Sequence, residues 1–314
     1  MPTMKAVLIL NPVAGTAPGQ RDALRRAVGY LVEHGWLVSW RETTPERNAT
    51  DIAREAVAEG VDVLIAAGGD GTINEVIQPI VGTDVRLGIL PVGTANVFAM
   101  EAGIATSLPM LAQNLQHAAE VLVEGATAAI DVGRANGRAF IMVAGIGFDA
   151  EVVRLVDFHT KQRLKGFAYI WQALRHLARY QGHVATITLD GDVMRTRIVM
   201  ATVSNTRLYA GVPLAPKARL MDGLLDVTLF QGRHWAALLW AALQTPFRWR
   251  AGLPPIMRRQ VQRVVIETTP PLPVQVDAEV HGTTPVTIEV APCALQVILP
   301  RDTIQKWTKE ETEA

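Results

Sequence analysis

The chain has 314 residues, and its 49% hydrophobic content is enough for the cores of two domains. Its 30 basic and 30 acidic residues cancel, so the charge balance gives no reason to expect a nucleic-acid partner. The single cysteine, Cys293, excludes a disulfide framework within the chain.

These features predict a protein of the reducing cytoplasm. The longest uninterrupted apolar run, residues 235–243, is far shorter than the ~20 residues that a membrane-spanning helix needs. We therefore expect a cytoplasmic protein that associates with membranes peripherally at most.

The first 130 residues alternate apolar runs with amphipathic stretches. The pattern predicts strands at residues 5–10, 36–40, 61–67 and 86–91, and helices at residues 21–34, 48–59 and 109–124. Strands that alternate with helices indicate an α/β domain with a doubly wound parallel sheet. Ligands of such sheets bind at the carboxyl ends of the strands.

Three glycine-bearing turns, at residues 11–16, 68–72 and 93–96, follow three of these strands, so we expect them at one edge of the sheet. The glycines of the central turn lack the Cβ atoms that would keep a phosphate away from the backbone amides. Thr72 is expected to cap the helix that follows. Asp70, placed among those amides, is either a solvated turn residue or a carboxylate linked to Mg²⁺.

The pattern changes after residue 131. Short β-rich segments predict an antiparallel, sandwich-like domain over residues 131–300, at residues 140–143, 184–189, 193–203, 224–230, 261–268, 274–276, 286–290 and 295–299. Asp190-Gly191 and Asp222-Gly223 are hairpin signals. A polar tail, residues 301–314, is expected to fray from residue 306 onward, and part of it could pack back on the first domain.

Two helical stretches, residues 166–180 and 234–244, interrupt this β-rich half. Tryptophan and arginine flank the second stretch over residues 233–250, and basic residues accompany the first over residues 161–179. Such segments either pack on the sandwich or dock on a membrane interface.

Six segments in order along the chain carry a resemblance to a known family. They are the segments NPVAG at 11–15, GGDGTINE at 68–75, GILPVGTANVFA at 88–99, GIGFDA at 145–150, MDGLLD at 221–226 and VDAE at 276–279. Together they resemble the diacylglycerol kinase catalytic-domain family, and more narrowly the soluble bacterial lipid kinases related to diacylglycerol and sphingosine kinases.

The resemblance implies an ATP-dependent kinase that acts on a lipid hydroxyl at a membrane surface, with the nucleotide between the two domains. It implies nucleotide contacts at Asn11, Thr43 (or Thr44), Gly68, Gly69, Asp70, Gly71, Thr72, Asn74 and Thr94. Glu279 would be the general base, with Asp70 as a second catalytic residue, and Asp222 would hold a structural Mg²⁺ with the carbonyls of Arg219 and Leu224. The prediction leaves room for a homodimer.

Two departures from the family pattern bear on these expectations. Ala278 replaces a glycine between Asp277 and Glu279, which strains the turn if that position has a positive φ. Arg47-Asn48 replaces a common Gly-Asp pair and blurs the assignment of Thr43.

Alternative functions remain open at this point. The sequence GIGFDA at 145–150 also resembles a dinucleotide fingerprint, but no acidic residue follows at the spacing that a ribose contact requires. Gly-Gly-Asp-Gly alone also fits an NAD kinase. A kinase fold silenced by Ala278 would be a nucleotide- or lipid-binding regulator, although retention of Asp70, Asn74 and Glu279 favours an active enzyme.

Overall fold

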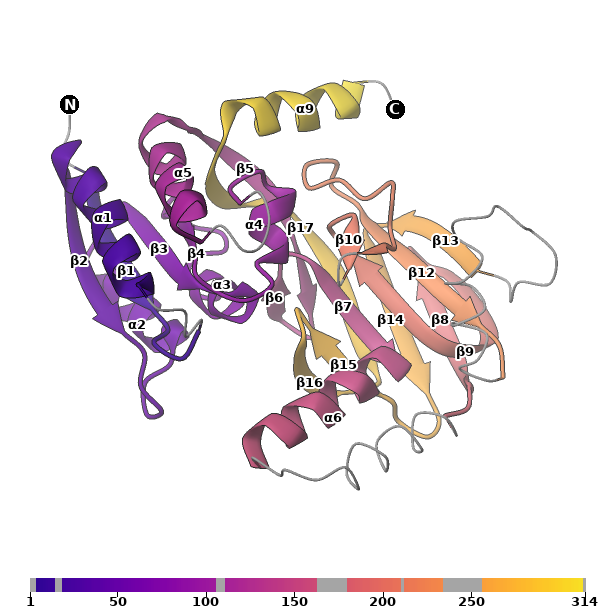
Figure 1. The fold of residues 1–314 in the computed structure, drawn as a ribbon. Helices are drawn as coiled ribbons and strands as arrows, with labels where there is room; N and C mark the ends of the chain where they lie inside the picture. The colour runs from indigo at the N-terminus through magenta and orange to yellow at the C-terminus, as the bar shows by residue number, and fades with distance from the viewer. Residues whose placement is uncertain are drawn as a thin grey trace.

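The structure is a computed structural model that describes residues 4–14, 19–105, 111–162, 180–209, 212–233 and 256–312. Figure 1 shows two halves: helices surround the strands of the first half, and strands dominate the second. The predicted α/β domain followed by an antiparallel β-rich domain is confirmed.

The first half is built on four strands in the order β4-β3-β1-β2, all parallel to their neighbours. These strands are β1 (Met4–Leu10), β2 (Trp36–Glu42), β3 (Val63–Gly68) and β4 (Arg86–Pro91). Each lies where the apolar pattern predicts it, and every residue of β3 is buried. A strand buried on both faces reads as a continuous apolar run, which is why this segment is easily recognised.

Helices connect these strands and cover the sheet. They are α1 (Gln20–Glu33), α2 (Ala49–Ala58), α3 (Asp70–Ile77), α4 (Val97–Glu101) and α5 (Leu111–Glu124). Asn48 caps α2, because its Oδ1 accepts a hydrogen bond of 2.9 Å from the backbone N–H of Asp51.

Among the described residues, the second half is a largely antiparallel array that carries the helix α6 (Phe148–Gln162). Its strands are β5 (Ala126–Ala135), β6 (Arg138–Phe140), β7 (Val143–Gly147), β8 (His183–Leu189), β9 (Asp192–Ser204), β10 (Leu208–Tyr209), β11 (Val212–Pro213), β12 (Leu225–Gln231), β13 (Ile256–Val261), β14 (Arg263–Thr268), β15 (Pro273–Val276), β16 (Glu279–Thr283) and β17 (Val286–Leu299).

Of the two predicted hairpin turns, Asp190-Gly191 and Asp222-Gly223, only the first forms a hairpin. Asp190 and Gly191 both have positive φ, 48° and 97°, and form the hairpin between β8 and β9. Asp222 and Gly223 instead lie in the loop that enters β12 from β11, so the hairpin expected there is wrong.

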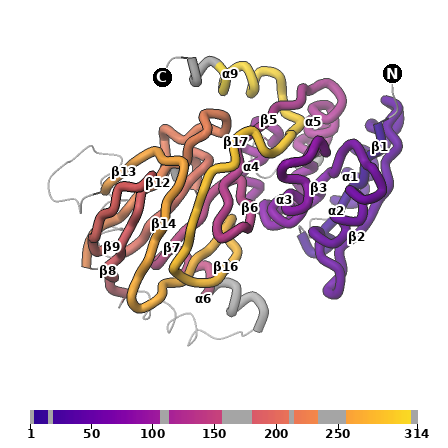
Figure 2. The backbone as a smooth tube through the Cα atoms, turned by 180° about the vertical axis from the view of Figure 1, so that it is seen from behind, coloured from indigo at the N-terminus to yellow at the C-terminus, as the bar shows by residue number. Residues whose placement is uncertain are grey.

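One strand, β17, joins the halves. Its first part pairs with β14, whereas its last part pairs in parallel with β4, where Gln296 faces Arg86. The described strands other than β10 and β11 therefore form one 15-stranded sheet that continues through both halves, and Figure 2 shows β17 running between them. The sequence predicts two separate runs here, residues 286–290 and 295–299, because a stretch of small residues interrupts the apolar pattern of one strand.

Two other segments differ from expectation. β5 was not predicted; it pairs with β17 over most of its length. Arg301–Thr312 forms the helix α9 where a fraying tail was expected, because Ile304 and Trp307 pack against the core of the first half. The helices predicted at residues 166–180 and 234–244 lie outside the described residues. Within the described part of the chain, the structure contains no helix with the length and apolar content to cross a membrane.

Candidate active site

The predicted glycine turns meet at the carboxyl edge of the parallel sheet. The backbone N–H of Asn11 donates to Ala67 O at 3.1 Å, and that of Thr43 donates to Leu10 O at 2.9 Å. The N–H of Gly93 donates to Gly68 O at 3.1 Å. Thr94 is exposed on the last of these turns. Backbone hydrogen bonds thus hold the ends of neighbouring strands together at the place where such sheets bind ligands.

The central and last turns need glycine because their backbones touch. A Cβ on Gly93 would lie 2.9 Å from Gly69 N and would overlap Gly69 Cα. A Cβ on Gly68 would overlap the Thr72 side chain. The resulting surface offers backbone without side chains, which is the arrangement that lets a phosphate approach amide groups.

The helix after this turn starts earlier than predicted. α3 begins at Asp70 with Gly69 as its N-cap, so the expected capping role of Thr72 is wrong. Thr72 already lies in the first turn of α3 and packs over Gly68.

Asp70 links the two glycine turns. Its Oδ2 accepts a hydrogen bond from Val97 N at 3.0 Å, and its Oδ1 accepts one from Phe98 N at 3.1 Å. These amides are the first of α4, so the carboxylate satisfies groups that a helix start leaves unpaired. A carboxylate oxygen has a further lone pair, and the link from Asp70 to a metal stays a prediction.

Two buried amide oxygens beside these turns lack a hydrogen-bond partner. They are Gln20 Oε1 and Asn96 Oδ1. Gln20 Nε2 donates to Val92 O at 3.2 Å, and Asn96 Nδ2 donates to Gly93 O at 2.8 Å. Both side chains therefore border the glycine turn at residues 93–96. Unpaired buried acceptors destabilise a protein unless a ligand or water supplies donors.

Asn74 joins the two halves rather than facing the turn. Its Nδ2 donates to Asp277 Oδ2 at 2.9 Å and to Ala139 O at 3.0 Å, and its Oδ1 accepts from Arg138 at 2.8 Å and from Gln78 at 3.2 Å. An asparagine side chain makes four hydrogen bonds at most, and all are used. In this arrangement the Asn74 side chain has no free donor or acceptor, and the expected nucleotide contact of Asn74 stays a prediction.

Asp277 anchors the turn that precedes Glu279. Its fully enclosed carboxylate accepts hydrogen bonds from the backbone N–H groups of Ile141, Met142 and Val143 at 2.9–3.0 Å, besides the bond from Asn74. Burial of a carboxylate is tolerated only with such partners. The carboxylate therefore ties the β15–β16 turn to β7 and to α3.

Glu279 is brought to the glycine turn from more than 200 residues away in the sequence. Its Oε1 lies 3.4 Å from the position that a Cβ on Gly71 would take, in the first turn of α3. Its Oε2 accepts a hydrogen bond of 2.7 Å from Arg138, in an ion pair whose side chains are 40% and 25% exposed. The carboxylate is thus held in place yet remains accessible.

The turn at Ala278 is strained, as expected where an alanine replaces the family's glycine at a position with positive φ. Asp277 and Ala278 have φ values of 47° and 67°, both in the left-handed region. Gln275 holds this turn, since its Oε1 accepts from Ala278 N at 2.7 Å while its Nε2 donates to Asp149 Oδ2 at 2.8 Å. A strained backbone persists when its surroundings determine it from several sides.

Ala278→Gly should therefore stabilise the protein, by about 1 kcal/mol. Removing the Cβ relieves a left-handed cost of roughly 1–2 kcal/mol, which the greater freedom of glycine in the unfolded chain offsets in part. Urea denaturation measures the change. Ala58→Gly is the control, because Ala58 is an exposed residue of α2, where glycine is expected to destabilise. A loss of stability in Ala278→Gly would show that its φ is not the source of strain.

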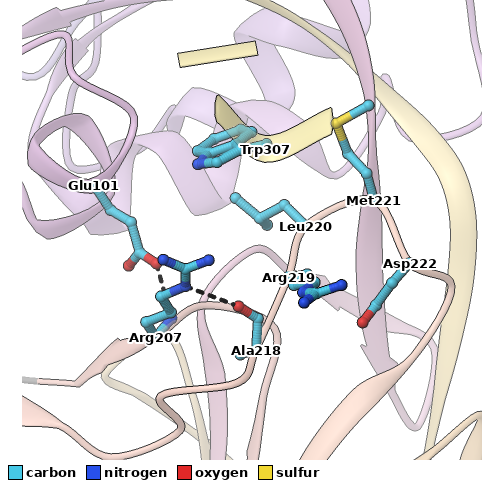
Figure 3. A pocket seen from close by; sticks show the side chains of 8 residues that line it. All are labelled: Glu101, Arg207, Ala218, Arg219, Leu220, Met221, Asp222 and Trp307. Carbon is cyan, nitrogen blue, oxygen red and sulfur yellow. Dashed lines mark hydrogen bonds between the residues drawn. The ribbon is translucent and has the colours of Figure 1, made fainter. Parts of the chain in front are cut away.

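The expected metal ligand Asp222 lies apart from the glycine turns, in an acidic group near α9. Figure 3 shows Asp222 beside Arg219 at a small pocket that Trp307 covers. Burial raises the pKa of Asp222 and raises the pKa of Asp226 to about 6, and the repulsion between neighbouring carboxylates adds to both shifts. Among the described residues, no three His, Cys, Asp or Glu side chains cluster closely enough to hold a metal by themselves.

Sequence reasoning missed three residues of this arrangement: Arg138, Gln275 and Asp149. Arg138 could have been found, because Asn136-Gly137 is a hairpin signal and forms the turn between β5 and β6, with φ values of 46° and 89°. Asp149 stands in the segment GIGFDA at 145–150 that carries the family resemblance, but only the fold shows that it bonds to Gln275, 126 positions away in the sequence.

Comparison with known proteins gives an independent view of the chain. It matches the family model of the diacylglycerol kinase catalytic domain over residues 5–135 and that of the YegS C-terminal NAD kinase beta sandwich-like domain over residues 142–299. It is similar to a diacylglycerol kinase from Mycobacterium tuberculosis (strain H37Rv), with 31% identity over 309 residues, 95% of this chain and 96% of the relative. A diacylglycerol kinase from Bacillus subtilis (strain 168) is 29% identical over 301 residues, which cover 95% and 97% of the two chains.

A solved structure agrees with these matches. The crystal structure of a diacylglycerol kinase from Bacillus anthracis str. Sterne superimposes with a TM-score of 0.72 at 26% identity, covering 95% of this chain and 98% of that one. Both halves, their order and the fold thus agree with one group of phosphotransferases. The chain belongs to the diacylglycerol kinase family of lipid kinases.

Proposed function

We propose that this enzyme transfers the γ-phosphate of Mg·ATP to the hydroxyl of a lipid, with a diacylglycerol-like lipid as the acceptor. The observation that carries the proposal is the position of Glu279, whose carboxylate lies over Gly71 beside the side-chain-free edge of the sheet. A base at that place can act on a hydroxyl that meets a phosphate held by the turns.

The edge of the sheet fits a nucleotide. Gly68 and Gly93 leave no room for a Cβ atom, so the turns meet as bare backbone. The buried Asn96 Oδ1 and Gln20 Oε1 lack hydrogen-bond donors, which the ribose hydroxyls or the base amino group of a nucleotide can supply. In the proposal, the turns at Asn11, Gly68–Thr72 and Thr94 hold the phosphates, with Thr43 beside them at the end of β2. Asp70 keeps the two glycine turns in register by binding the start of α4.

The acidic group at Asp222 fits a divalent cation. Carboxylates whose pKa is raised by burial and by mutual repulsion are relieved when positive charge arrives. Magnesium is commonly held by one or two carboxylates with water completing its shell, so Asp222 with the carbonyls of Arg219 and Leu224 is a sufficient set. A bound Mg²⁺ here would organise the loop before β12.

Catalysis in this proposal depends on placement more than on covalent chemistry. Glu279 takes the proton from the lipid hydroxyl as the oxygen attacks phosphorus, and Arg138 holds the carboxylate in the required orientation. Mg·ATP, when bound, supplies the phosphoryl group and neutralises its developing charge. The Asp277 anchor and the Gln275 bond keep the base from moving with the strained turn.

A transfer assay with radiolabelled ATP tests the proposal. The acceptors are diacylglycerol, phosphatidylglycerol, ceramide, a sphingoid base and NAD, each presented with magnesium. We expect labelled phosphate on a lipid, most rapidly on diacylglycerol. Transfer to NAD alone would assign an NAD kinase. ATP binding without transfer to any acceptor would identify the protein as a nucleotide- or lipid-binding regulator, a kinase fold silenced by Ala278.

A further inference from the structure

The three glycine turns contain no positively charged side chain of their own. Residues 11–16, 68–72 and 93–96 include neither lysine nor arginine, whereas Asp70 stands in the central turn and Glu279 lies beside it. A phosphoryl group in transfer carries negative charge on its peripheral oxygens, and fixed groups that neutralise this charge supply much of the catalysis. Any cationic side chain at this place therefore comes from another segment of the fold.

Arg138 of β6 brings a positive charge to the edge of this site. Its Nη2 group donates to Glu279 Oε2 at 2.7 Å and to Asn74 Oδ1 at 2.8 Å. The other oxygen of the same carboxylate, Oε1, lies 3.4 Å from the position that a Cβ on Gly71 would take. The width of one carboxylate therefore separates the guanidinium from the backbone of the central glycine turn.

The Arg138 guanidinium has donors to spare. Such a group carries five N–H donors in one plane, and the bonds to Glu279 and Asn74 use the two on Nη2, which leaves three on Nε and Nη1. In the described part of the chain, no further protein group accepts a hydrogen bond from Arg138. Because the side chain is 25% exposed, a ligand can reach it.

The fold holds Arg138 in a fixed place beside α3. The next residue, Ala139, donates from its backbone N–H to Gln78 Oε1 at 3.1 Å, and its carbonyl accepts from Gln78 Nε2 at 3.0 Å. Gln78 is the C-cap of α3, the helix whose first turn holds Gly71, and α3 and β6 lie side by side in Figure 1. Asn74 of the same helix bonds to the guanidinium itself. A group fixed in this way stabilises developing charge without a cost of reorganisation.

The remaining donors of Arg138 suit a phosphoryl oxygen. Guanidinium groups match the geometry of phosphate, and charge-assisted hydrogen bonds are roughly twice as strong as neutral ones. The attacking hydroxyl must bond to the Glu279 carboxylate while it approaches phosphorus. The phosphoryl oxygens therefore come close to a cation that is already bonded to that carboxylate.

We propose that Arg138 is a catalytic residue, which binds an oxygen of the transferred γ-phosphoryl group through Nε or Nη1 in addition to holding Glu279. This inference rests on the proposed lipid-kinase function and adds a residue that touches the reacting group. As the lipid oxygen bonds to the γ-phosphorus, the bond from that phosphorus to the bridging oxygen breaks, and its electron pair leaves with ADP. The proton of the hydroxyl passes to Glu279, while Arg138 transfers no proton and stabilises the charge on the phosphoryl oxygens.

A double-mutant cycle of Arg138→Met and Glu279→Gln tests whether Arg138 acts directly. Methionine keeps much of the side-chain length but has neither the charge nor the donors. We expect Arg138→Met to lower kcat for the lipid acceptor about 10²-fold. It should lower kcat at least ~10-fold again in the Glu279→Gln background, because a contact with the phosphoryl group does not act through the base. A double variant as active as Glu279→Gln alone would overturn the inference and leave Arg138 as a positioning residue for Glu279.

Calorimetric binding of AMP-PNP and of ADP, each with magnesium, gives a second readout that needs no lipid. Only AMP-PNP, a non-hydrolysable ATP analogue, carries the third phosphoryl group. Arg138→Met should raise the Kd for AMP-PNP about tenfold and change the Kd for ADP less than about twofold. An unchanged Kd for AMP-PNP, or an equal rise for both nucleotides, would contradict the contact. If the unaltered enzyme phosphorylates no lipid, the proposed function fails separately, and these Kd values still decide the role of Arg138.

Two further variants separate the contact from charge and from folding. Arg138→Lys keeps the charge without the planar set of donors, so we expect a loss in kcat of about tenfold, and full activity would rule out binding through Nε or Nη1. Arg259→Met is the matched control, because Arg259 is an exposed arginine of β13 that also pairs with a carboxylate, Asp192 Oδ2, at 3.5 Å. It should leave kcat and both Kd values unchanged. If thermal unfolding shows that Arg138→Met does not fold, Arg138→Lys takes its place in the cycle and in the binding test, where the same direction of change is expected.

Discussion

Glu279→Gln is expected to lower kcat for the lipid acceptor by at least ~10²-fold while leaving the KM for ATP nearly unchanged. Glutamine keeps the size of the side chain and can still contact Arg138 through its carbonyl oxygen, but it cannot accept a proton from the attacking hydroxyl. The variant places an NH₂ group over Gly71 in place of an oxygen but leaves the backbone amides of the glycine turns unchanged, so nucleotide binding should persist. Steady-state kinetics with the best acceptor of the panel measures both constants.

Glu267→Gln supplies the matched control for this experiment. Glu267 is an exposed glutamate of β14, so the same chemical change there should leave kcat unaltered. Unchanged turnover in Glu279→Gln would remove Glu279 from the role of base. A rise in the KM for ATP with constant kcat would instead make Glu279 a binding residue.

Asp277→Asn is expected to destabilise the protein by about 2–4 kcal/mol, a large share of the stability of an ordinary domain. The carboxylate accepts hydrogen bonds from three consecutive backbone N–H groups and from Asn74 in a fully enclosed site. An asparagine would turn an NH₂ group toward some of these donors and leave them unpaired. Denaturant unfolding measures the loss, together with the midpoint of thermal unfolding.

Asp190→Asn tests whether enclosure, rather than the number of contacts, makes Asp277 important. The Asp190 carboxylate also accepts from two backbone amides, those of Gln262 and Arg263, but it is exposed to water. Water can replace those bonds, and asparagine tolerates the left-handed φ of 48° at this position, so the expected loss is below about 1 kcal/mol. Equal losses at both sites would contradict the argument.

The first half of the fold could be predicted because its signals are local. β3 is buried on both faces and reads as an apolar run, and the glycine turn after it needs residues without a Cβ where Gly69 and Gly93 approach. The continuity of β17 and the helix α9 escaped prediction for the opposite reason. Small residues in the middle of β17 hide a single long strand, and only contact with the core gives Ile304 and Trp307 their role in α9.

The sequence by itself determined the order of the elements and the glycine edge, because glycine geometry and apolar periodicity act over a few residues. Glu279 became a candidate base only through the family resemblance of the segment VDAE at 276–279. Only the tertiary structure decided that Asn74 joins the halves, that Arg138 pairs with Glu279 and that Gln275 bonds to Asp149. These facts depend on strand register and on contacts between residues 64 to 203 positions apart, and no local pattern encodes them.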